Sequence, residues 1–407
     1  MKVKKIAEFN PAPASPIAGR SEIDYIDTAA VVEGRLGDVQ RLSKMFPSRA
    51  QREIHTNDIL ISSVRPNLKH NFFVDDSADG MIASSGFIHI RVKKSSDVSP
   101  RFLYYYLTSP AQVHRYVKIA DSSQSAYPSF NKDVVEDIEL PTIDLPTQLR
   151  IAGILGSLDE KIELNRKKIA ELEALAKTIY DYWFVQFDFP DKNGKPYKSS
   201  GGKMVWNEQL KREVPEGWEV GTIHSICDLL VGGTPSKKVS DYWNGSIPFW
   251  GPTDCSDSIF QFHTASQITD SGFAHCSSDM IPENSTVITA RGSIGKVAMV
   301  GVKMAMNQSC FAFHSNDGED VFLYYLAKQL VNHLKQTSTG SVFNAFVSSD
   351  LKNVILSLGN KSVRHLYSQI ADGVFMQIKT LVQQINELIN LRDTLLPLLM
   401  NGQVVVK

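Results

Sequence analysis

Residues 147–187 read TQLRIAGILGSLDEKIELNRKKIAELEALAKTIYDYWFVQF, and this stretch decides the fold. Apolar residues recur in it with alternating steps of four and three, and no proline interrupts the run. Such spacing is typical of a helix that pairs with another helix in a coiled coil. The positions that we expect to face a partner helix are Ile151, Leu155, Leu158, Ile162, Asn165, Ile169 and Leu172.

A second stretch, residues 363–401, has the same pattern, with Arg392 as its one charged interruption and Pro397 close to the expected end of the helix. An amphipathic helix lying on its own domain is the commoner source of such a stripe. Helices this long are rare in globular domains, however, so two of them favour antiparallel pairing with each other. Asn165 would set the register, with Gln384 opposite it or facing a partner helix. The pairing positions on the second helix are Val374, Ile378, Leu381, Ile385 and Leu388.

Short matches recur in the same order in both halves of the chain, at offsets of roughly 220 residues. Any one of them could arise by chance, but four in register indicate an internal repeat. The matched pairs are 59–65 with 286–291, 102–105 with 322–325, 124–130 with 340–346, and 150–153 with 369–372.

Each repeat begins with a head that we expect to be α/β. The stretch 88–92 alternates as a half-buried strand does, 287–289 and 297–300 are strand-like, and short helices are expected at 101–107 and 321–335. The predicted fold is thus two α/β domains joined by two long antiparallel coiled-coil helices, with a pseudo-twofold internal repeat. The expected boundaries are 1–146 and 217–362 for the heads, 147–187 and 363–401 for the helices, and 188–216 for a linker rich in Gly, Pro, Lys and Ser.

Composition sets limits on function. The 407 residues carry a formal net charge of −1, so any DNA-binding face must be basic locally and offset by acidic surface elsewhere. No apolar stretch has signal-peptide or membrane-span length, which favours a cytoplasmic protein with no membrane association. The four cysteines form no Cys-x-x-Cys pair and read as reduced thiols. A zinc site is the weaker alternative, because adjacent His275 and Cys276 rarely bind one metal; its ligands would be Cys255, His263, His275 and Cys276.

Several motifs resemble one known family, the specificity subunits of type I restriction-modification enzymes. They are DEKIELN at 159–165 running into WFVQFDF at 183–189, PYK at 196–198, GGKM at 201–204, PEGW at 215–218, GGTPS at 232–236 and LRDTLLPLLMNG at 391–402. The resemblance covers the whole chain. The first head departs from it, because it has no GGTPS and carries Arg65-Pro66-Asn67-Leu68-Lys69 where the second head has Arg291-Gly292-Ser293-Ile294-Gly295-Lys296.

The resemblance implies that each head is a target recognition domain for one half of a split site in double-stranded DNA. It also implies that the long helices act as a ruler and dock two methyltransferase subunits and, in a complete system, two restriction subunits. S-adenosylmethionine, ATP and Mg would then be bound by those partners, with no cofactor in this chain. A helix over residues 148–184 would span about 55 Å. One turn of B-DNA is about 34 to 36 Å, so the heads could reach sites one turn or slightly more apart.

Candidate DNA-contacting residues lie in polar loops, several of which follow apolar strands that could aim them into a groove. Arg291 is expected to read a base and Lys296 to hold a phosphate. Tyr127 and Phe343 read as core residues. The candidates in the first head are Arg65, Asn67, Lys69, His70, Ser123 and Gln124. Those in the second head are Thr234, Ser236, Lys237, Lys238, Arg291, Ser293, Lys296, Thr339 and Ser341.

No catalytic motif is visible in the chain. It contains no Gly-x-x-x-x-Gly-Lys-Ser/Thr phosphate loop and no His-Glu-x-x-His, so we expect a non-catalytic subunit without catalytic residues or a metal site. Two alternatives stay open at this point. One is the specificity subunit of a related system whose methyltransferase and nuclease are fused in one partner chain. The other is a coiled-coil scaffold whose two heads bind proteins.

Overall fold

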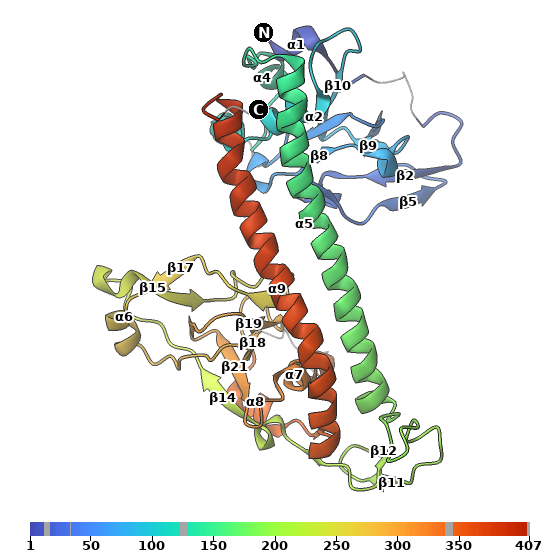
Figure 1. The fold of residues 1–407 in the computed structure, drawn as a ribbon, viewed down its shortest axis with the longest axis vertical. Coiled ribbons are helices and arrows are strands. Elements are labelled where there is room, and N and C mark those ends of the chain that lie inside the picture. The colour runs from blue at the N-terminus through green and yellow to red at the C-terminus, as the bar shows by residue number, and fades with distance from the viewer. Residues whose placement is uncertain (12–16, 33, 123–127, 338–344, 405–407) are drawn as a thin grey trace. The chain divides into compact units, whose positions relative to one another are not determined.

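The computed structural model describes residues 1–407 except 12–16, 33, 123–127, 338–344 and 405–407. The chain divides into two compact units, residues 1–162 with 387–407 and residues 163–386. Each unit holds one head and one stretch of each of the two long helices, α5 (Leu145–Tyr180) and α9 (Lys361–Met400) (Figure 1). α5 continues into a wider, π-helical turn over Asp181–Val185.

The first head contains two four-stranded sheets, ordered β1-β10-β7-β8 and β5-β2-β9-β6. Their strands are β1 (Ala7–Phe9), β2 (Glu22–Ile26), β5 (Gln40–Ser43), β6 (Ala50–Glu53), β7 (Ile59–Ser62), β8 (Asn71–Phe73), β9 (Ile82–Ser84) and β10 (Phe87–Val92), with a small ribbon of β3 (Val31–Val32) and β4 (Arg35–Leu36). The helices are α1 (Val3–Ile6), α2 (Pro100–Leu107), α3 (Pro110–Asp121) and α4 (Asp133–Glu136). Apolar side chains of the first sheet and of α2 and α3 share one core cluster, which includes Ile61, Ile90, Leu103 and Tyr116.

The second head has a five-stranded sheet ordered β14-β21-β18-β19-β16 and a three-stranded sheet ordered β17-β15-β20. The strands are β14 (Cys227–Val231), β15 (Trp243–Trp250), β16 (Phe260–Gln261), β17 (Ser266–Ile268), β18 (Thr286–Thr289), β19 (Val297–Val300), β20 (Ala305–Met306) and β21 (Cys310–Ser315), plus the pair β13 (Val220–Gly221) and β22 (Leu356–Ser357). Its helices are α6 (Asp270–Ala274), α7 (Asp320–Thr337) and α8 (Ser348–Asn353). The strands predicted at 88–92, 287–289 and 297–300 and the helices predicted at 101–107 and 321–335 are therefore confirmed.

The two heads share a common set of strand pairings, which confirms the repeat: β1-β10-β7-β8 corresponds to β14-β21-β18-β19, and β5-β2-β9 to β17-β15-β20, while β6 and β16 lie outside this common set. In the first sheet of each head, Ile61 lies opposite Ile88 and its counterpart Ile288 lies opposite Phe311, both in antiparallel pairs. In the second sheet of each head, one strand pair is parallel, β2 with β9 and β15 with β20. Matching antiparallel and parallel pairings over the common strands of both heads are the signature of a duplicated unit.

Within each unit the stretches of the long helices run antiparallel. In the first unit the Nη1 atom of Arg392 lies 2.9 Å from a carboxylate oxygen of Asp159, and Ile151 and Leu155 share a core cluster with Leu399. In the second unit Asn165 is hydrogen-bonded to Gln384, and the Tyr367 hydroxyl donates to the carbonyl of Ala176. Because the residue number on α9 falls as that on α5 rises, the predicted antiparallel pairing is confirmed.

The buried stripe of α9 is wider than the sequence predicts. Ile378 and Ile385 are buried as expected, whereas Val374, Leu381 and Leu388 are only half-buried. Phe375, which was not among the predicted pairing positions of α9, is buried as well. This ring contacts Tyr324 of α7 and Phe260 of β16, so this stretch of α9 packs on its own head as well as on α5.

In the predicted linker, 188–216, no helix or strand includes Pro196 or Gly201-Gly202, and the only regular element lies after them. That element is a hairpin of β11 (Met204–Asn207) and β12 (Arg212–Pro215). Before the hairpin, Phe189 stacks on Tyr197 and Trp218 at centroid distances of 4.7 and 5.1 Å. Aromatic packing therefore orders a segment whose composition is typical of a loop.

Candidate nucleic-acid interface

Arg291 stands in a short loop that directly follows β18. The backbone amides of Ala290 and Arg291 both donate to the carbonyl of Ser309, at 2.7 and 3.2 Å. Gly292 and Gly295 adopt left-handed backbone conformations, which favour glycine, with φ of +75° and +74°. The Arg291 side chain is exposed, and no hydrogen bond or ion pair is found for it among the described residues. A fixed backbone thus presents an unpaired guanidinium to solvent.

The other candidates in this loop are more constrained. The ammonium of Lys296 donates to the carbonyl of Cys255 at 3.1 Å, while the Lys296 backbone amide donates to the hydroxyl of Thr289 at 3.0 Å. The carbonyl of Ser293 accepts from the same Thr289 hydroxyl, and the Ser293 side chain is exposed. Lys296 is therefore tied to the protein in this structure, whereas Arg291 is not.

The segment 232–238 uses its glycines for packing. A Cβ on Gly232 would lie 1.9 Å from the carbonyl oxygen of Asn307, and one on Gly233 would lie 2.6 Å from the Ser277 hydroxyl. The Gly233 amide is not open to a phosphate, because it donates to the carbonyl of Met306 at 3.0 Å. The exposed polar groups of the segment are the side chains of Ser236, Lys237 and Lys238.

The turn 307–309 brings two predicted segments together. Ser309 holds the Arg291 loop, and the Gln308 side chain accepts a hydrogen bond from the hydroxyl of Thr234. The structure thus places the segments 232–238 and 290–296 on either side of one exposed glutamine. Sequence analysis missed Gln308, although its position between an apolar strand and β21 is the same kind of signal that identified Arg291.

The first head repeats this arrangement with different side chains. The Ser63 amide donates to the carbonyl of Gly86 at 3.0 Å, and the Arg65 amide donates to the carbonyl of Pro128 at 2.8 Å. Arg65 and Lys69 adopt left-handed conformations, with φ of 48° and 51°, which are uncommon for residues with a side chain. The side chains of Arg65, Asn67 and Lys69 are exposed. His70 is half-buried and bonds the carbonyl of Thr28 through Nδ1, so its ring supports the loop from inside.

The structure describes only part of the polar stretches at 122–125 and 337–341. Ser123, Gln124, Tyr127, Thr339, Ser341 and Phe343 lie outside the described residues. Their flanks occupy equivalent places, because Phe130 donates its amide to the carbonyl of Ser63 at 3.0 Å and Phe346 donates to that of Ala290 at 2.9 Å. In both heads the loop after β7 or β18 is therefore hydrogen-bonded to two segments. One is the turn before β10 or β21, and the other is the segment that follows these polar residues.

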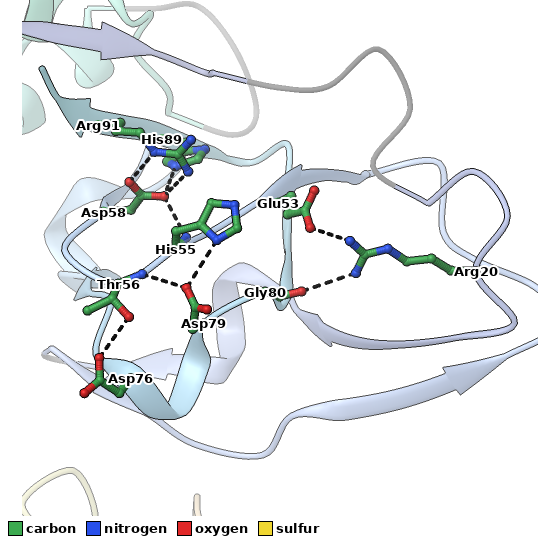
Figure 2. A network of polar contacts seen from close by, with 10 residues as sticks. All are labelled: Arg20, Glu53, His55, Thr56, Asp58, Asp76, Asp79, Gly80, His89 and Arg91. Carbon is green, nitrogen blue, oxygen red and sulfur yellow. Dashed lines mark hydrogen bonds and ion pairs between the residues drawn. The ribbon is translucent and has the colours of Figure 1, made fainter. Parts of the chain in front are cut away.

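A polar network centred on the buried carboxylate of Asp58 lies at the start of β7, the end away from the loop that carries Arg65 (Figure 2). The Asp58 carboxylate, just before β7, accepts from Nε and Nη2 of Arg91 at 2.8 and 2.6 Å and lies 2.7 Å from Nε2 of His89. Burial opposes ionisation of Asp58, but the hydrogen bonds from Arg91 and His89 outweigh it and hold the pKa below its ordinary value. In the second head Ser285 and His314 take the places of Asp58 and Arg91, 3.1 Å apart.

This network joins strands and turns of one head. His55 donates its amide to Asp58 at 2.8 Å and its ring lies 3.2 Å from Asp79 (Figure 2). Sequence analysis missed the network, since the residues are 31 and 33 positions apart and only strand pairing brings them together. The one local signal of the network in the sequence was that His89 and Arg91 alternate with apolar residues in the strand at 87–92.

The described part of the chain offers neither a metal-binding cluster nor a membrane-spanning helix. No group of three or more His, Cys, Asp and Glu residues there could hold a metal ion, and all four cysteines are free thiols. Burial raises the pKa of Cys227 to about 12. No helix there is both long and apolar enough to cross a membrane.

Comparison with known proteins identifies the family. A family model described as the type I restriction modification DNA specificity domain matches residues 11–174 and 215–391. The chain is 25% identical to the type I restriction enzyme HindI specificity subunit of Haemophilus influenzae, over 89% of each chain. It is 23% identical to the MjaIX specificity subunit of Methanocaldococcus jannaschii, over 91% of this chain and 86% of that one.

Among solved structures, the chain is similar to the type I restriction-modification S subunit from M. genitalium, with a TM-score of 0.57 at 14% identity. The match covers 98% of this chain and 95% of that one, and shows a shared fold. Because the family model covers most of both heads and most of both long helices, the chain belongs to the family of type I restriction-modification specificity subunits.

Proposed function

We propose that each head of this specificity subunit reads one block of a two-part DNA sequence and that the long helices dock two methyltransferase subunits. Specificity subunits of this family are not enzymes, and methylation and cleavage belong to partner subunits. The observation that carries the proposal is a shared framework with different loops. The two heads share a common set of strand pairings, but the loop that carries an arginine continues as Pro66-Asn67 in the first head and as Gly292-Ser293 in the second.

Shared topology with divergent loops is what two readers of different sequences require. Strands fix the backbone, so the side chains at their ends can be aimed at base edges or phosphates. Arg291 supports this role best, because its guanidinium is exposed and unpaired on an anchored backbone. A planar guanidinium can donate two parallel hydrogen bonds to guanine in the major groove. Lys237 and Lys238 are better suited to phosphates, since an ammonium acts as a point charge.

The surface that we propose for methyltransferase docking consists of exposed apolar side chains on the long helices. Apolar side chains that face solvent on a paired helix favour a protein partner. Those on α5 are Leu149, Ile154, Leu164 and Leu175, and those on α9 are Leu366, Ile370, Met376 and Leu391. In this proposal the helices also set the spacer between the two blocks, since a 36-residue helix such as α5 spans about 54 Å.

A head exchange tests the proposal. Residues 217–362 would be replaced by the corresponding head of another family member, and the methylated sequence would be mapped in cells that also express the methyltransferase. We expect one block of the target to change and the other block and the spacer to stay as they were. If both blocks change together, or neither does in a folded protein, separate reading by the two heads is excluded. If the exchanged chain still selects DNA but no longer binds the methyltransferase, the docking surface is not confined to the long helices and includes the exchanged head.

A further inference from the structure

Arg52, on β6 of the first head, is a half-buried cation without a partner. No hydrogen bond and no ion pair is found for its side chain among the described residues, and its Nε atom is shielded from solvent without an acceptor. Burial lowers the pKa of this guanidinium, and no acidic neighbour counters the effect. A buried charge is costly unless it is paired, so the guanidinium of Arg52 would gain from an acceptor that the described residues do not supply.

Other arginines of the same head are paired with carboxylates. Each of these contacts joins a guanidinium to an acidic side chain of the same unit; the pairs are Arg20 with Glu53, Arg41 with Glu22, Arg91 with Asp58 and Arg101 with Glu160. Arg52 is flanked in sequence by Glu53, but that carboxylate is taken by Arg20. Arg35, Arg49 and Arg115 have no carboxylate partner among the described residues either, but they are exposed to water, whereas Arg52 is half-buried.

The position of Arg52 connects it to the candidate DNA-binding loop. β6 pairs antiparallel with β9, Arg52 lies opposite Ala83, and the register shifts between Ala50 and Arg52. Such a bulge re-aims the side chain that follows it. β9 ends at Ser84, and two residues later the carbonyl of Gly86 holds the amide of Ser63, where the loop carrying Arg65 begins. Arg52 is thus only a few residues, through hydrogen-bonded backbone, from that loop.

We propose that Arg52 binds a phosphate of the DNA backbone beside the block read by the first head. The proposal rests on the proposed function, since it assumes that this head binds DNA. A phosphate carries a full negative charge, which compensates a half-buried cation better than the partial charges of a base edge do. Because the side chain stands on a paired strand, it loses little conformational freedom when it binds. Arg52 therefore contributes affinity for every sequence and not discrimination among bases.

The test compares Arg52→Met with Arg41→Met in the complex of the chain with its methyltransferase. Methionine keeps much of the apolar stem of arginine, and the Arg41 variant carries the same change in net charge on the same sheet. The probes are a duplex with the methylated sequence and a scrambled duplex of equal length. For Arg52→Met we expect binding to both probes to weaken by the same factor, about tenfold. The slope of log K against log salt should fall in magnitude by about 0.9, and the melting temperature without DNA should not fall. Arg41→Met should leave the slope unchanged.

Several results would overturn the inference. Loss of binding confined to one base position would make Arg52 a base reader. Unchanged binding, or a lower melting temperature with unchanged binding, would give the guanidinium a structural role or none. If inorganic phosphate without DNA raises the melting temperature of the native chain but not of Arg52→Met, at matched ionic strength, the site takes a free anion. If the unmodified complex does not distinguish the two probes, it is the proposed function that fails, and equal Arg52-dependent weakening of both probes would then still support the phosphate contact.

Discussion

Asn165 on α5 donates a hydrogen bond to the side-chain oxygen of Gln384 on α9, at 3.2 Å and across 219 residues of sequence. Asn165 is buried and Gln384 is exposed, so the asparagine depends on this contact more than its partner does. A polar residue on a helix seam favours the one register in which it is satisfied. The pairing predicted from the heptad spacing is confirmed, and it fixes how the two helices align in the second unit.

The first prediction concerns this pair. Asn165→Ala should lower the free energy of unfolding by about 1 kcal/mol, because a buried hydrogen bond is lost while Gln384 can turn to water. Asn165→Leu with Gln384→Leu should be more stable but less specific in register. Urea unfolding of the single and double alanine variants measures the coupling. Gln383→Ala, an exposed neighbour, serves as the control. A coupling near zero would show that the contact does not set the register.

The second prediction concerns the Asp58 network. Asp58→Asn should cost about 2–4 kcal/mol, because it removes the negative charge that pairs with Arg91 and replaces one of the two acceptor oxygens that face Arg91 and the buried His89 with an NH2 donor. The folded-state pKa of Asp58 is lowered, so its contribution is present above the ordinary value of 3.8 and is lost as the pH falls below it. Unfolding measured between about pH 7 and pH 3 should therefore show an acid loss of stability that Asp58→Asn lacks.

The control for that measurement is Asp133→Asn, which changes an exposed carboxylate of the same head. It should keep the acid loss seen in the native chain. An identical pH profile for the native chain and Asp58→Asn would contradict the role assigned to the network.

The third prediction separates two residues of one loop. Arg291→Ala should cost about 1–3 kcal/mol of binding and relax discrimination at one position of one block, because the exposed guanidinium is proposed to read a base. The exposed ammonium of Lys296 keeps its charge and two N–H donors beside its bond to Cys255, so Lys296→Ala should weaken all sequences alike and reduce the salt slope by about one. Binding to single-base variants at two salt concentrations measures both. Equal weakening of every site by Arg291→Ala would rule out base reading by this residue.

The fourth prediction concerns the helices as a ruler. Inserting seven residues near Lys167 and seven near Glu387 preserves both apolar stripes and lengthens the pair by roughly 10 Å. The preferred spacer should grow by about three base pairs, because B-DNA rises about 3.4 Å per pair. An unmatched insertion in α5 alone is the control, and it should disrupt the pairing. A folded double insertion with an unchanged spacer would show that the helices do not set the distance.

The local sequence pattern was sufficient to predict the fold, but it was not sufficient to predict the side-chain contacts around the candidate DNA-binding site. Heptad spacing identified both long helices, and short matches such as 102–105 with 322–325 located the repeat. Arg392, read as an interruption of the stripe, is in fact paired with Asp159, which also accepts from the Tyr105 hydroxyl at 2.6 Å. A pattern along one helix cannot show which side chain another segment brings to it.

The same limit explains the residues that sequence analysis missed. Arg52 and Gln308 are ordinary surface residue types in sequence, and only the burial of one and the contacts of the other distinguish them. The phosphate role expected of Lys296 stays a prediction, but the sequence did not show that its ammonium also donates to a carbonyl 41 residues away. Partners of charged side chains are set by tertiary contacts, which a single sequence does not encode locally.

The most direct test of the account is to map methylated bases across the genome of cells that express this chain with its methyltransferase. The account predicts that the chain directs methylation to one sequence made of two short specified blocks, separated by a fixed number of unspecified base pairs. Cells with the methyltransferase alone should lack this pattern. A single uninterrupted block, or methylation that does not depend on the chain, would contradict the claim that two heads read a split site.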